Sequence, residues 1–295
     1  MEAYTDFAKV YDELMDDTPY EAWCDCIIEI LGRYGAGPEP TDKNLRQERN
    51  TILDLGCGTG TLTELLARKG YDMIGVDNAQ EMLQIAMEKR ERSGLDILYL
   101  MQDMRELELY GTVGTVVSVC DSLNYLLTEV DIVQTFERVN NYLYPQGIFI
   151  FDFNTVYKYA VVIGDATIAE NREDCSFIWE NYYHEEEEIN EYDLTVFVSD
   201  VRNEFGEDGA AAEKACGQAA ERFRRFQEMH YQRGYRLEQM KALLLQAGME
   251  FLEALDADTR GEVTEESERI YVVARKGAET TANQKVVSDI TNNNM

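Results

Sequence analysis

The chain has 295 residues with an ordinary hydrophobic fraction of 45%, and its 27 basic and 57 acidic residues give a formal net charge of −30. This excess of negative charge repels nucleic-acid phosphates and counts against a DNA or RNA substrate. No run approaches the roughly 18 apolar residues of a membrane span, and the N-terminus lacks a signal-peptide pattern, so we expect a cytoplasmic protein. The six cysteines are scattered, which favours reduced thiols and no metal site.

Residues 1–40 predict a helical leader that acts as a lid. Apolar residues recur at helical spacing in two groups, and a stretch rich in glycine and proline at 35–40 ends the pattern. Tyr11 lies on the first of these helical faces. It is either a packing residue or a residue that folds over a bound ligand.

The sequence then predicts a buried strand at 51–55 that runs into a glycine-rich turn and a helix. Gly56, Gly58 and Gly60 allow a sharp turn and close approach to a ligand, because no β-carbon stands in the way. Thr61 and Glu64 have the spacing of a capping box at the start of the helix. Strand, glycine turn and helix in this order form the nucleotide-binding unit of doubly wound α/β folds.

A second strand at 72–76 ends at an acid, Asp77, which follows Asp54 by 23 residues. In Rossmann-like folds an acid at about this distance binds a ribose diol, because one carboxylate can accept hydrogen bonds from both hydroxyls. The glycine turn and the spaced acid together predict a nucleotide-containing ligand.

Strands and helices continue to alternate up to residue 153, which predicts a parallel sheet covered on both faces. The expected strands are near 96–101, 113–120 and 147–153, and the expected helices are near 61–69, 79–92 and 129–143. Strand-like segments at 175–183, 191–199 and 222–231 then predict an antiparallel insertion over 154–230 that serves as a substrate lid. A helix from 237 and strands near 249–255 and 269–275 complete a core made of 41–153 and 231–277. The polar segment 278–295 is expected to be disordered.

The pattern D-x-G-x-G-x-G at Asp54–Gly60, with Asp77 behind it, resembles motif I of the class I S-adenosylmethionine (SAM)-dependent methyltransferases. The resemblance implies a seven-stranded Rossmann-like sheet, SAM as cofactor and S-adenosylhomocysteine (SAH) as product. The pattern Tyr4-x-x-Phe7-Ala8-x-x-Tyr11-Asp12 and the insertion look like a bacterial small-molecule branch that includes sugar N-methyltransferases.

The resemblance also implies a set of cofactor-binding residues. Asp54 would lie near the methionine ammonium, Asp77 would bind the ribose, and Cys120 would offer its backbone carbonyl to the ammonium. The adenine would meet the carboxylate of Asp103 and the backbone N–H of Met104. Two further residues have open alternatives: Asn78 contacts adenine or ribose, or caps a helix, and Met82 is an adenine wall or a core residue. The remaining cofactor candidates are Gly56, Gly58, Gly60 and Tyr11.

Residues after the fourth strand match motif IV of the family by position, and they would face the methyl group or the substrate. Asp121, Asn124 and Tyr125 belong to this set. His230 on the last inserted strand is either near the substrate or a structural histidine. The candidates for catalysis are His230, Asp121 and Tyr11, and those for substrate binding are Asn124, Tyr125 and His230.

The sequence therefore predicts a SAM-dependent methyltransferase that acts on N or O of a small molecule, as a monomer or homodimer, without nucleic-acid or membrane partners. Two alternatives stay open: a methyltransferase acting on RNA or protein, and a non-catalytic regulatory protein that binds SAM.

Overall fold

The computed structural model describes residues 7–35, 48–199 and 222–277. Some sequence-based expectations lie outside these ranges. They concern Tyr4, the break at 36–40, the link between the inserted strands at 200–221 and the tail at 278–295. None of the described helices is long and apolar enough to cross a membrane.

A seven-stranded sheet in the order β10-β11-β5-β4-β1-β2-β3 forms the centre of the molecule. Its five parallel strands are β1 (Thr51–Leu55), β2 (Asp72–Asp77), β3 (Ile97–Met101), β4 (Val113–Ser118) and β5 (Leu143–Asn154). The strand β11 (Arg269–Arg275) is antiparallel to both β5 and β10 (Glu250–Asp256). The chain order reverses where β1 lies between β2 and β4, and this reversal places a ligand crevice beyond the carboxyl ends of these strands.

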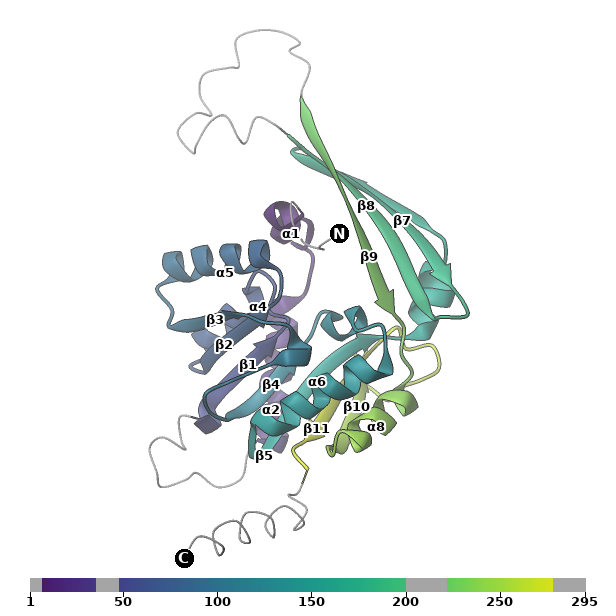
Figure 1. The fold of residues 1–295 in the computed structure, drawn as a ribbon. Coiled ribbons are helices and arrows are strands. Elements are labelled where there is room, and N and C mark those ends of the chain that lie inside the picture. The colour runs from purple at the N-terminus through teal and green to yellow at the C-terminus, as the bar shows by residue number, and fades with distance from the viewer. Residues whose placement is uncertain (1–6, 36–47, 200–221, 278–295) are drawn as a thin grey trace, which may run out of the picture.

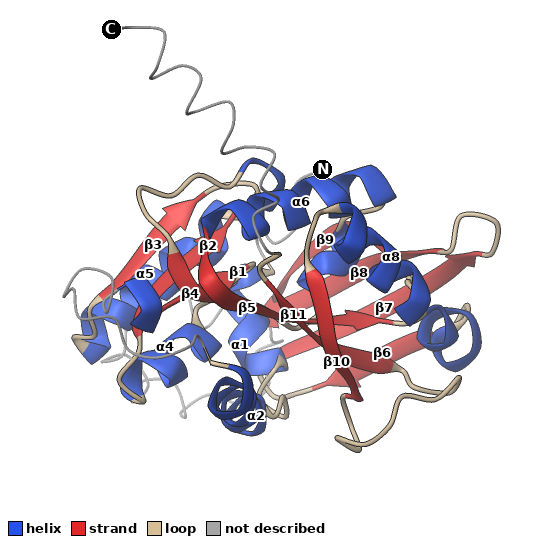
Figure 2. Cartoon of the chain, turned by 90° about the horizontal axis from the view of Figure 1, so that it is seen from below, coloured by secondary structure: helices blue, strands red, loops and turns tan. Residues whose placement is uncertain are grey.

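Helices cover both faces of this sheet (Figure 2). One face packs against α6 (Glu129–Tyr142) and α8 (Leu237–Gln246). The other packs against α2 (Tyr20–Tyr34), α4 (Thr61–Arg68) and α5 (Gln80–Ser93). Strand β5 is a continuous apolar run because both of its faces are buried. Phe149, Phe151 and Phe153 face the first helical layer, while Ile148 and Ile150 face the second.

A separate four-stranded antiparallel sheet projects from one end of the molecule (Figure 1). Its strands are β6 (Thr167–Asn171), β7 (Cys175–His184), β8 (Ile189–Ser199) and β9 (Phe223–Arg233), and a π-helix (Lys158–Ile163) precedes them. The doubly wound seven-stranded sheet and the inserted antiparallel sheet were both predicted, and the structure confirms them. Strand β6 was not predicted, because all five of its residues are exposed and leave no alternating apolar pattern.

Helix α1 (Ala8–Leu14) lies between the two sheets (Figure 1). On one side Val10 packs against the inserted sheet, with Tyr192, Leu194 and Val196. On the other side Ala8 packs against Ala79 and Met82 at the start of α5. The leader therefore connects the inserted sheet to the central domain next to the crevice.

One predicted helix cap is wrong, and the structure excludes one of the two alternatives left open for Asn78. Helix α4 has Gly60 as its N-cap, with φ +75°, so Thr61 is already inside the helix and makes no capping bond. Helix α5 is capped by Ala79 in an extended conformation without a side-chain hydrogen bond, so Asn78 does not cap it. In both places the backbone turn beside the crevice determines where the helix starts.

Candidate active site

A cavity of about 500 Å³ opens at the carboxyl ends of β1, β2 and β4. Many of the predicted site residues contribute to its wall, along with residues that the sequence did not single out. The predicted residues in the wall are Tyr11, Asp54, Gly56, Gly58, Asp77, Asn78, Met82, Asp103, Met104, Cys120 and Tyr125. Gly60, Asp121, Asn124 and His230 are outside this lining.

The turn after β1 leaves its backbone open to the cavity. Gly58 has φ +53°, and a β-carbon built on it would meet no protein atom within 4 Å, so the backbone here is open to a ligand. At Gly56, with φ +81°, a β-carbon would lie 2.6 Å from Oγ of Ser122. The Ser122 hydroxyl itself donates to the Gly56 carbonyl at 3.3 Å. The glycines therefore keep the turn close to the loop after β4 and form a cradle for a ligand.

Asp77 ends β2 with its carboxylate at the cavity wall. Its oxygens accept hydrogen bonds from the backbone N–H groups of Gly58 and Ala79, each at 2.8 Å. Burial raises the pKa of Asp77, and these two N–H groups act in the opposite direction by stabilising the charged form. The carboxylate is therefore held at the end of β2 in a fixed orientation.

Asp54 lies deeper, at the end of β1, with only 2% of its surface exposed. It accepts a hydrogen bond from the Thr63 hydroxyl at 2.6 Å. Burial raises the pKa of Asp54 to about 7, although the Thr63 hydrogen bond opposes the shift. A cationic group in the cavity would favour the ionised form.

Asp103 follows β3 and forms a two-point ion pair with Arg105, which the sequence did not single out. Arg105 donates from Nε at 2.9 Å and from Nη2 at 2.6 Å, and this pairing lowers the pKa of Asp103. Arg105 belongs to the 3-10 turn Met104–Glu106 and also lines the cavity. Met82 is 2% exposed, packs against Ala8 and lines the cavity, so it serves both as core and as wall.

The loop after β4 carries two non-glycine residues with left-handed backbone, Cys120 at φ +63° and Asp121 at φ +54°. Such a conformation is unfavourable for residues with a β-carbon and needs support from its surroundings. Asp152 on β5 supplies it: its carboxylate accepts from the backbone N–H of Cys120 at 3.1 Å and of Asp121 at 2.8 Å. Burial raises the pKa of the Cys120 thiol to about 12, so the thiol stays protonated.

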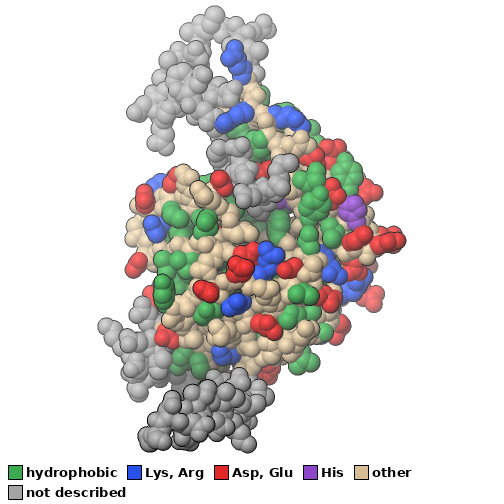
Figure 3. Space-filling model, viewed as in Figure 1, with side chains coloured by type: hydrophobic (Ala, Val, Ile, Leu, Met, Phe, Trp, Pro, Cys, Tyr) green, Lys and Arg blue, Asp and Glu red, His purple; other side chains and the backbone are tan. Residues whose placement is uncertain are grey.

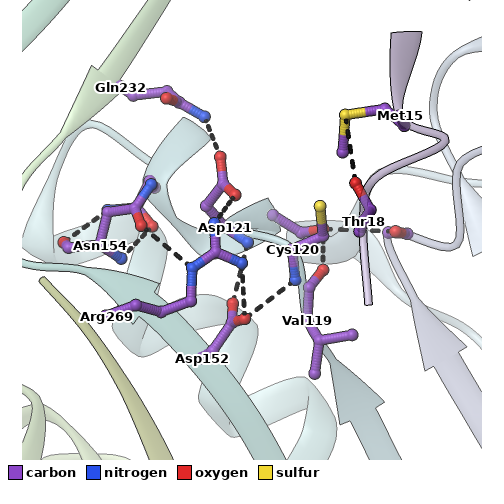
Figure 4. A network of polar contacts seen from close by, with 12 residues as sticks. Met15, Thr18, Val119, Cys120, Asp121, Asp152, Asn154, Gln232 and Arg269 are labelled. Atoms are coloured by element: carbon purple, nitrogen blue, oxygen red, sulfur yellow. Dashed lines mark hydrogen bonds and ion pairs between the residues drawn. The ribbon is translucent and has the colours of Figure 1, made fainter. Parts of the chain in front are cut away.

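Arg269, at the start of β11, joins Asp121 of this loop to Asp152 of β5 (Figure 4). Its guanidinium lies 2.7 Å from Asp121 and 3.1 Å from the fully buried Asp152. The other carboxylate oxygen of Asp121 accepts from the Gln232 side chain at 2.7 Å. Asp121 therefore connects β9, β11 and the loop after β4.

Asn124 is fully buried, and its side chain joins three backbone groups. Its Nδ2 donates to the carbonyls of Asn154 at 3.0 Å and Arg233 at 2.7 Å, and its Oδ1 accepts from the Asn154 N–H at 2.9 Å. These contacts hold the 3-10 turn Ser122–Tyr125 against the ends of β5 and β9.

Helix α1 closes one side of the cavity. The Tyr11 hydroxyl lies 3.8 Å from the Cys120 sulfur. The next residue, Asp12, has its carboxylate 2.5 Å from the Lys89 ammonium on α5, and this carboxylate also accepts a hydrogen bond from the Thr59 hydroxyl at 2.6 Å. Lys89 also donates to Thr61 at 2.8 Å. No local sequence pattern indicates this contact, because Asp12 and Lys89 are far apart in the chain.

His230 on β9 lies behind Tyr125, away from the cavity wall. Its side chain is fully buried, its Nδ1 is 3.2 Å from the Tyr125 hydroxyl, and its Nε2 is 3.4 Å from Glu228. The ring stacks on Tyr192 at 4.7 Å between centroids, with an interplanar angle of 6°. Glu228 and Tyr192 were not predicted, although the alternation of β9 places Glu228 on the same face as His230.

Comparison with known proteins decides the family. A sequence model described as a methyltransferase domain matches residues 52–147. The Bacillus subtilis (strain 168) protein described as "Putative methyltransferase YqeM" is 36% identical over 275 residues, which cover 92% of this chain and 97% of that protein. A protein of the same description from Geobacillus sp. (strain WCH70) is 36% identical over 92% of this chain and 99% of its own length.

The chain belongs to the SAM-dependent methyltransferases. The crystal structure of a SAM-dependent methyltransferase from Clostridium acetobutylicum ATCC 824 superimposes with a TM-score of 0.74 at 28% identity, over 94% of this chain and all of that one. The sugar N-methyltransferase KedS8 from Streptoalloteichus sp. has the same fold, with a TM-score of 0.65 at 16% identity, over 94% of this chain and 97% of its own. The predicted family, enzyme class and SAM cofactor are confirmed.

The residues that line the cavity of this methyltransferase are compatible with its cofactor. The bare backbone at Gly58 leaves room that a β-carbon would fill, and the Asp77 carboxylate in the cavity wall has the chemistry to accept hydrogen bonds from a diol. The buried acid Asp54 suits a cationic ammonium, which would offset the effect of burial on its pKa. The chemistry of these residues is therefore compatible with SAM, because two carboxylates can accept hydrogen bonds from it and a glycine leaves space for it.

Proposed function

We propose that this methyltransferase transfers the SAM methyl group to N or O of a small molecule bound between the loop after β4 and the leader. The observation that carries the proposal is the closure of the cavity by α1, which packs on α5 and on the inserted sheet and places Tyr11 against Cys120. A cavity of about 500 Å³ with this cover suits a small acceptor better than a polymer.

We also propose roles for the cavity residues. Asp77 binds the ribose hydroxyls, Asp54 lies near the methionine ammonium, and the Cys120 carbonyl accepts from the same ammonium. Asp103 and Met104 bind the adenine, and Tyr11 covers the cofactor. Bound SAM supplies an activated sulfonium methyl group, so the protein's own contribution is to orient the acceptor and exclude water.

Three predicted site residues serve as supports in this proposal. Asp121 and Asn124 make hydrogen bonds to protein groups, so we assign them to positioning the loop that carries Cys120 and Tyr125. His230 is separated from the cavity by Tyr125, so it acts on the acceptor through that residue. Among the described residues no cluster of His, Cys, Asp or Glu could hold a metal ion, and the proposal uses none.

We also propose how the chain divides by function. Residues 1–40 and 154–230 act as the lid and substrate wall, and 41–153 with 231–277 bind SAM. The five cysteines that the structure describes are free thiols, which supports a cytoplasmic location.

Isotope labelling of separated cell fractions tests the acceptor class. The enzyme is incubated with SAM that carries a trideuterated methyl group and with three fractions of a bacterial lysate: metabolites below about 1 kDa, RNA and protein. We expect the label in a compound of the metabolite fraction, as detected by mass spectrometry. An enzyme with Asp77→Ala, which we expect to bind SAM poorly, controls for labelling by traces of other methyltransferases. Label confined to the RNA or protein fraction would overturn the proposal.

RNA is the second candidate, because one surface feature favours it. Arg222, Arg224 and Arg225 are exposed where β9 begins, at the outer end of the inserted sheet, where basic side chains gather (Figure 3). Elsewhere on this face acidic and basic side chains are mixed. With a net charge of −30 we expect no retention of tRNA at about 150 mM salt, and submicromolar, salt-sensitive binding would favour RNA instead.

A further inference from the structure

We propose that Glu228 is a positioning residue that fixes the orientation and the tautomer of His230, so that Tyr125 and His230 together take the proton that the methyl acceptor loses. This inference rests on the proposed function, since only an acceptor with an N–H or O–H group needs such a path. It adds Tyr125 and Glu228 to His230, which the sequence already marks as a candidate for catalysis. Tyr125 carries the proton, His230 accepts it and Glu228 orients the ring.

The path begins at Tyr125, which lines the cavity. The Tyr125 hydroxyl lies 2.9 Å from the Tyr192 hydroxyl and 3.2 Å from Nδ1 of His230. Burial raises the pKa of Tyr192, so this phenol keeps its proton and can donate it to the Tyr125 oxygen. The Tyr125 proton then points to Nδ1, which must be the unprotonated nitrogen of the ring.

Glu228 lies on the opposite side of the ring. Its Oε2 is 3.4 Å from Nε2 of His230, and Glu228 is only 4% exposed. This contact has the distance of an ion pair and not the geometry of a hydrogen bond, so Glu228 acts on the ring through its negative charge, which favours the tautomer that carries its proton on Nε2 and leaves the lone pair on Nδ1. Stacking on Tyr192 restricts rotation of the ring. Tyr125, His230 and Glu228 thus have the order of a proton carrier, a base and an orienting acid.

The second oxygen of Glu228 links this arrangement to the leader. Oε1 accepts a hydrogen bond from the backbone N–H of Phe7 at 3.1 Å, just before α1. Because the Phe7 N–H can only donate, an oxygen of residue 228 must face the leader. The other terminal atom of that side chain then faces Nε2 of His230. The arrangement is therefore complete when α1 is packed against the inserted sheet.

The proton step balances within these groups. As the acceptor nitrogen or oxygen forms its new bond to carbon, its proton moves to the Tyr125 oxygen, and the Tyr125 proton moves to Nδ1 of His230. The resulting imidazolium faces the Glu228 carboxylate, which stabilises its charge. The proton leaves to solvent later, and the ring returns to its starting tautomer.

Nitrogen NMR on histidine tests the orientation directly, because the chain contains two histidines. In protein labelled with ¹⁵N-histidine, the nitrogen shifts of the neutral ring distinguish the tautomers. We expect His230 to carry its proton on Nε2. In Glu228→Gln the amide oxygen faces the Phe7 N–H and the amide NH₂ faces Nε2, so the tautomer should change to Nδ1–H. His184, which is exposed and pairs with Glu191 at 2.8 Å, is the internal control and should not change.

Kinetics with the acceptor found by labelling completes the test. Glu228→Gln should lower kcat by about 10²–10⁴-fold, as expected for loss of a general base, with SAH affinity unchanged. Tyr125→Phe should lower kcat similarly while His230 keeps its Nε2–H tautomer, and this separates the relay from a folding defect. An Nδ1–H tautomer in the wild-type protein, or a Glu228→Gln variant with the wild-type tautomer or kcat, would overturn the inference. The NMR experiment needs no methyl acceptor. It therefore tests the role of Glu228 even if the labelling experiment contradicts the proposed acceptor class.

Discussion

Oδ2 of Asp54 accepts a hydrogen bond of 2.6 Å from the hydroxyl of Thr63, and both side chains are buried at the base of the cofactor cavity. Burial raises the pKa of Asp54 to about 7, far above the value of about 3.9 for an unperturbed aspartate. Between these two values the folded protein binds more protons than the unfolded chain. The free energy of unfolding therefore falls as the pH rises from about 4 to about 7, and the loss is complete above pH 7.

Asp54→Asn should stabilise the ligand-free protein while it weakens cofactor binding. The amide keeps an oxygen for Thr63 but cannot ionise, so we expect a higher Tm at pH 8 and a smaller gain at pH 5. At pH 8 calorimetry should show SAH binding weakened by about 1.5–3 kcal/mol, the loss of a hydrogen bond to a charged group. In the wild-type protein SAH affinity should decline below pH 7. The exposed Asp96→Asn is the matched control, and a lower Tm of Asp54→Asn at pH 8 would contradict this account.

Arg269→Met should destabilise the fold strongly, because it leaves the fully buried Asp152 without its cationic partner. Breaking a buried ion pair on one side costs about 3–5 kcal/mol. Burial already raises the pKa of Asp152, and Arg269 limits the shift, so its removal should raise the pKa further. The loss of stability should then be larger at pH 8 than at pH 5, as measured by urea unfolding.

Arg275→Met is the control for this experiment. Arg275 lies on the same strand, and its guanidinium is 4.0 Å from Glu250, which is well exposed. Exposed pairs contribute about 0–1 kcal/mol, so this variant should unfold almost like the wild type. Equal effects of the two substitutions would show that Asp152 does not depend on Arg269.

Lys89→Met should loosen the leader over the cofactor. Lys89 holds Asp12 of α1 at 2.5 Å and contacts Thr59 and Thr61 beside the glycine turn. Hydrogen bonds to charged groups contribute about 1.5–3 kcal/mol, so we expect SAH to dissociate at least about tenfold faster in stopped-flow measurements. Limited proteolysis within 7–16 should accelerate in parallel. Lys69→Met, which removes an exposed pair with Asp25 at 3.4 Å, should change neither rate. Unchanged dissociation in Lys89→Met would show that the leader is no lid.

The sequence predicts the parts of this structure that depend on local patterns. Strands such as 51–55 and 72–77 follow from apolar runs, and the glycine turn and Asp77 follow from spacing along a single β-α-β unit. The supports of the site come from distant segments: Arg269 reaches Asp121 across 148 residues, and Glu228 reaches Phe7 across 221. No local sequence pattern indicates contacts between residues so far apart in the chain. The same limit explains why Asn124 reads as a substrate residue in the sequence, whereas its amide joins two strand ends in the structure.

The central claim is that the cavity beside the glycine turn binds SAM with Asp77 on the ribose, and one calorimetric cycle tests it. SAH and an SAH analogue without the two ribose hydroxyls are titrated into the wild type, Asp77→Ala and the exposed control Asp72→Ala. We predict that Asp77→Ala weakens SAH binding by about 1.5–3 kcal/mol but hardly changes binding of the analogue, while Asp72→Ala leaves both unchanged. Equal losses for SAH and the analogue in Asp77→Ala, or no loss for SAH, would contradict the account.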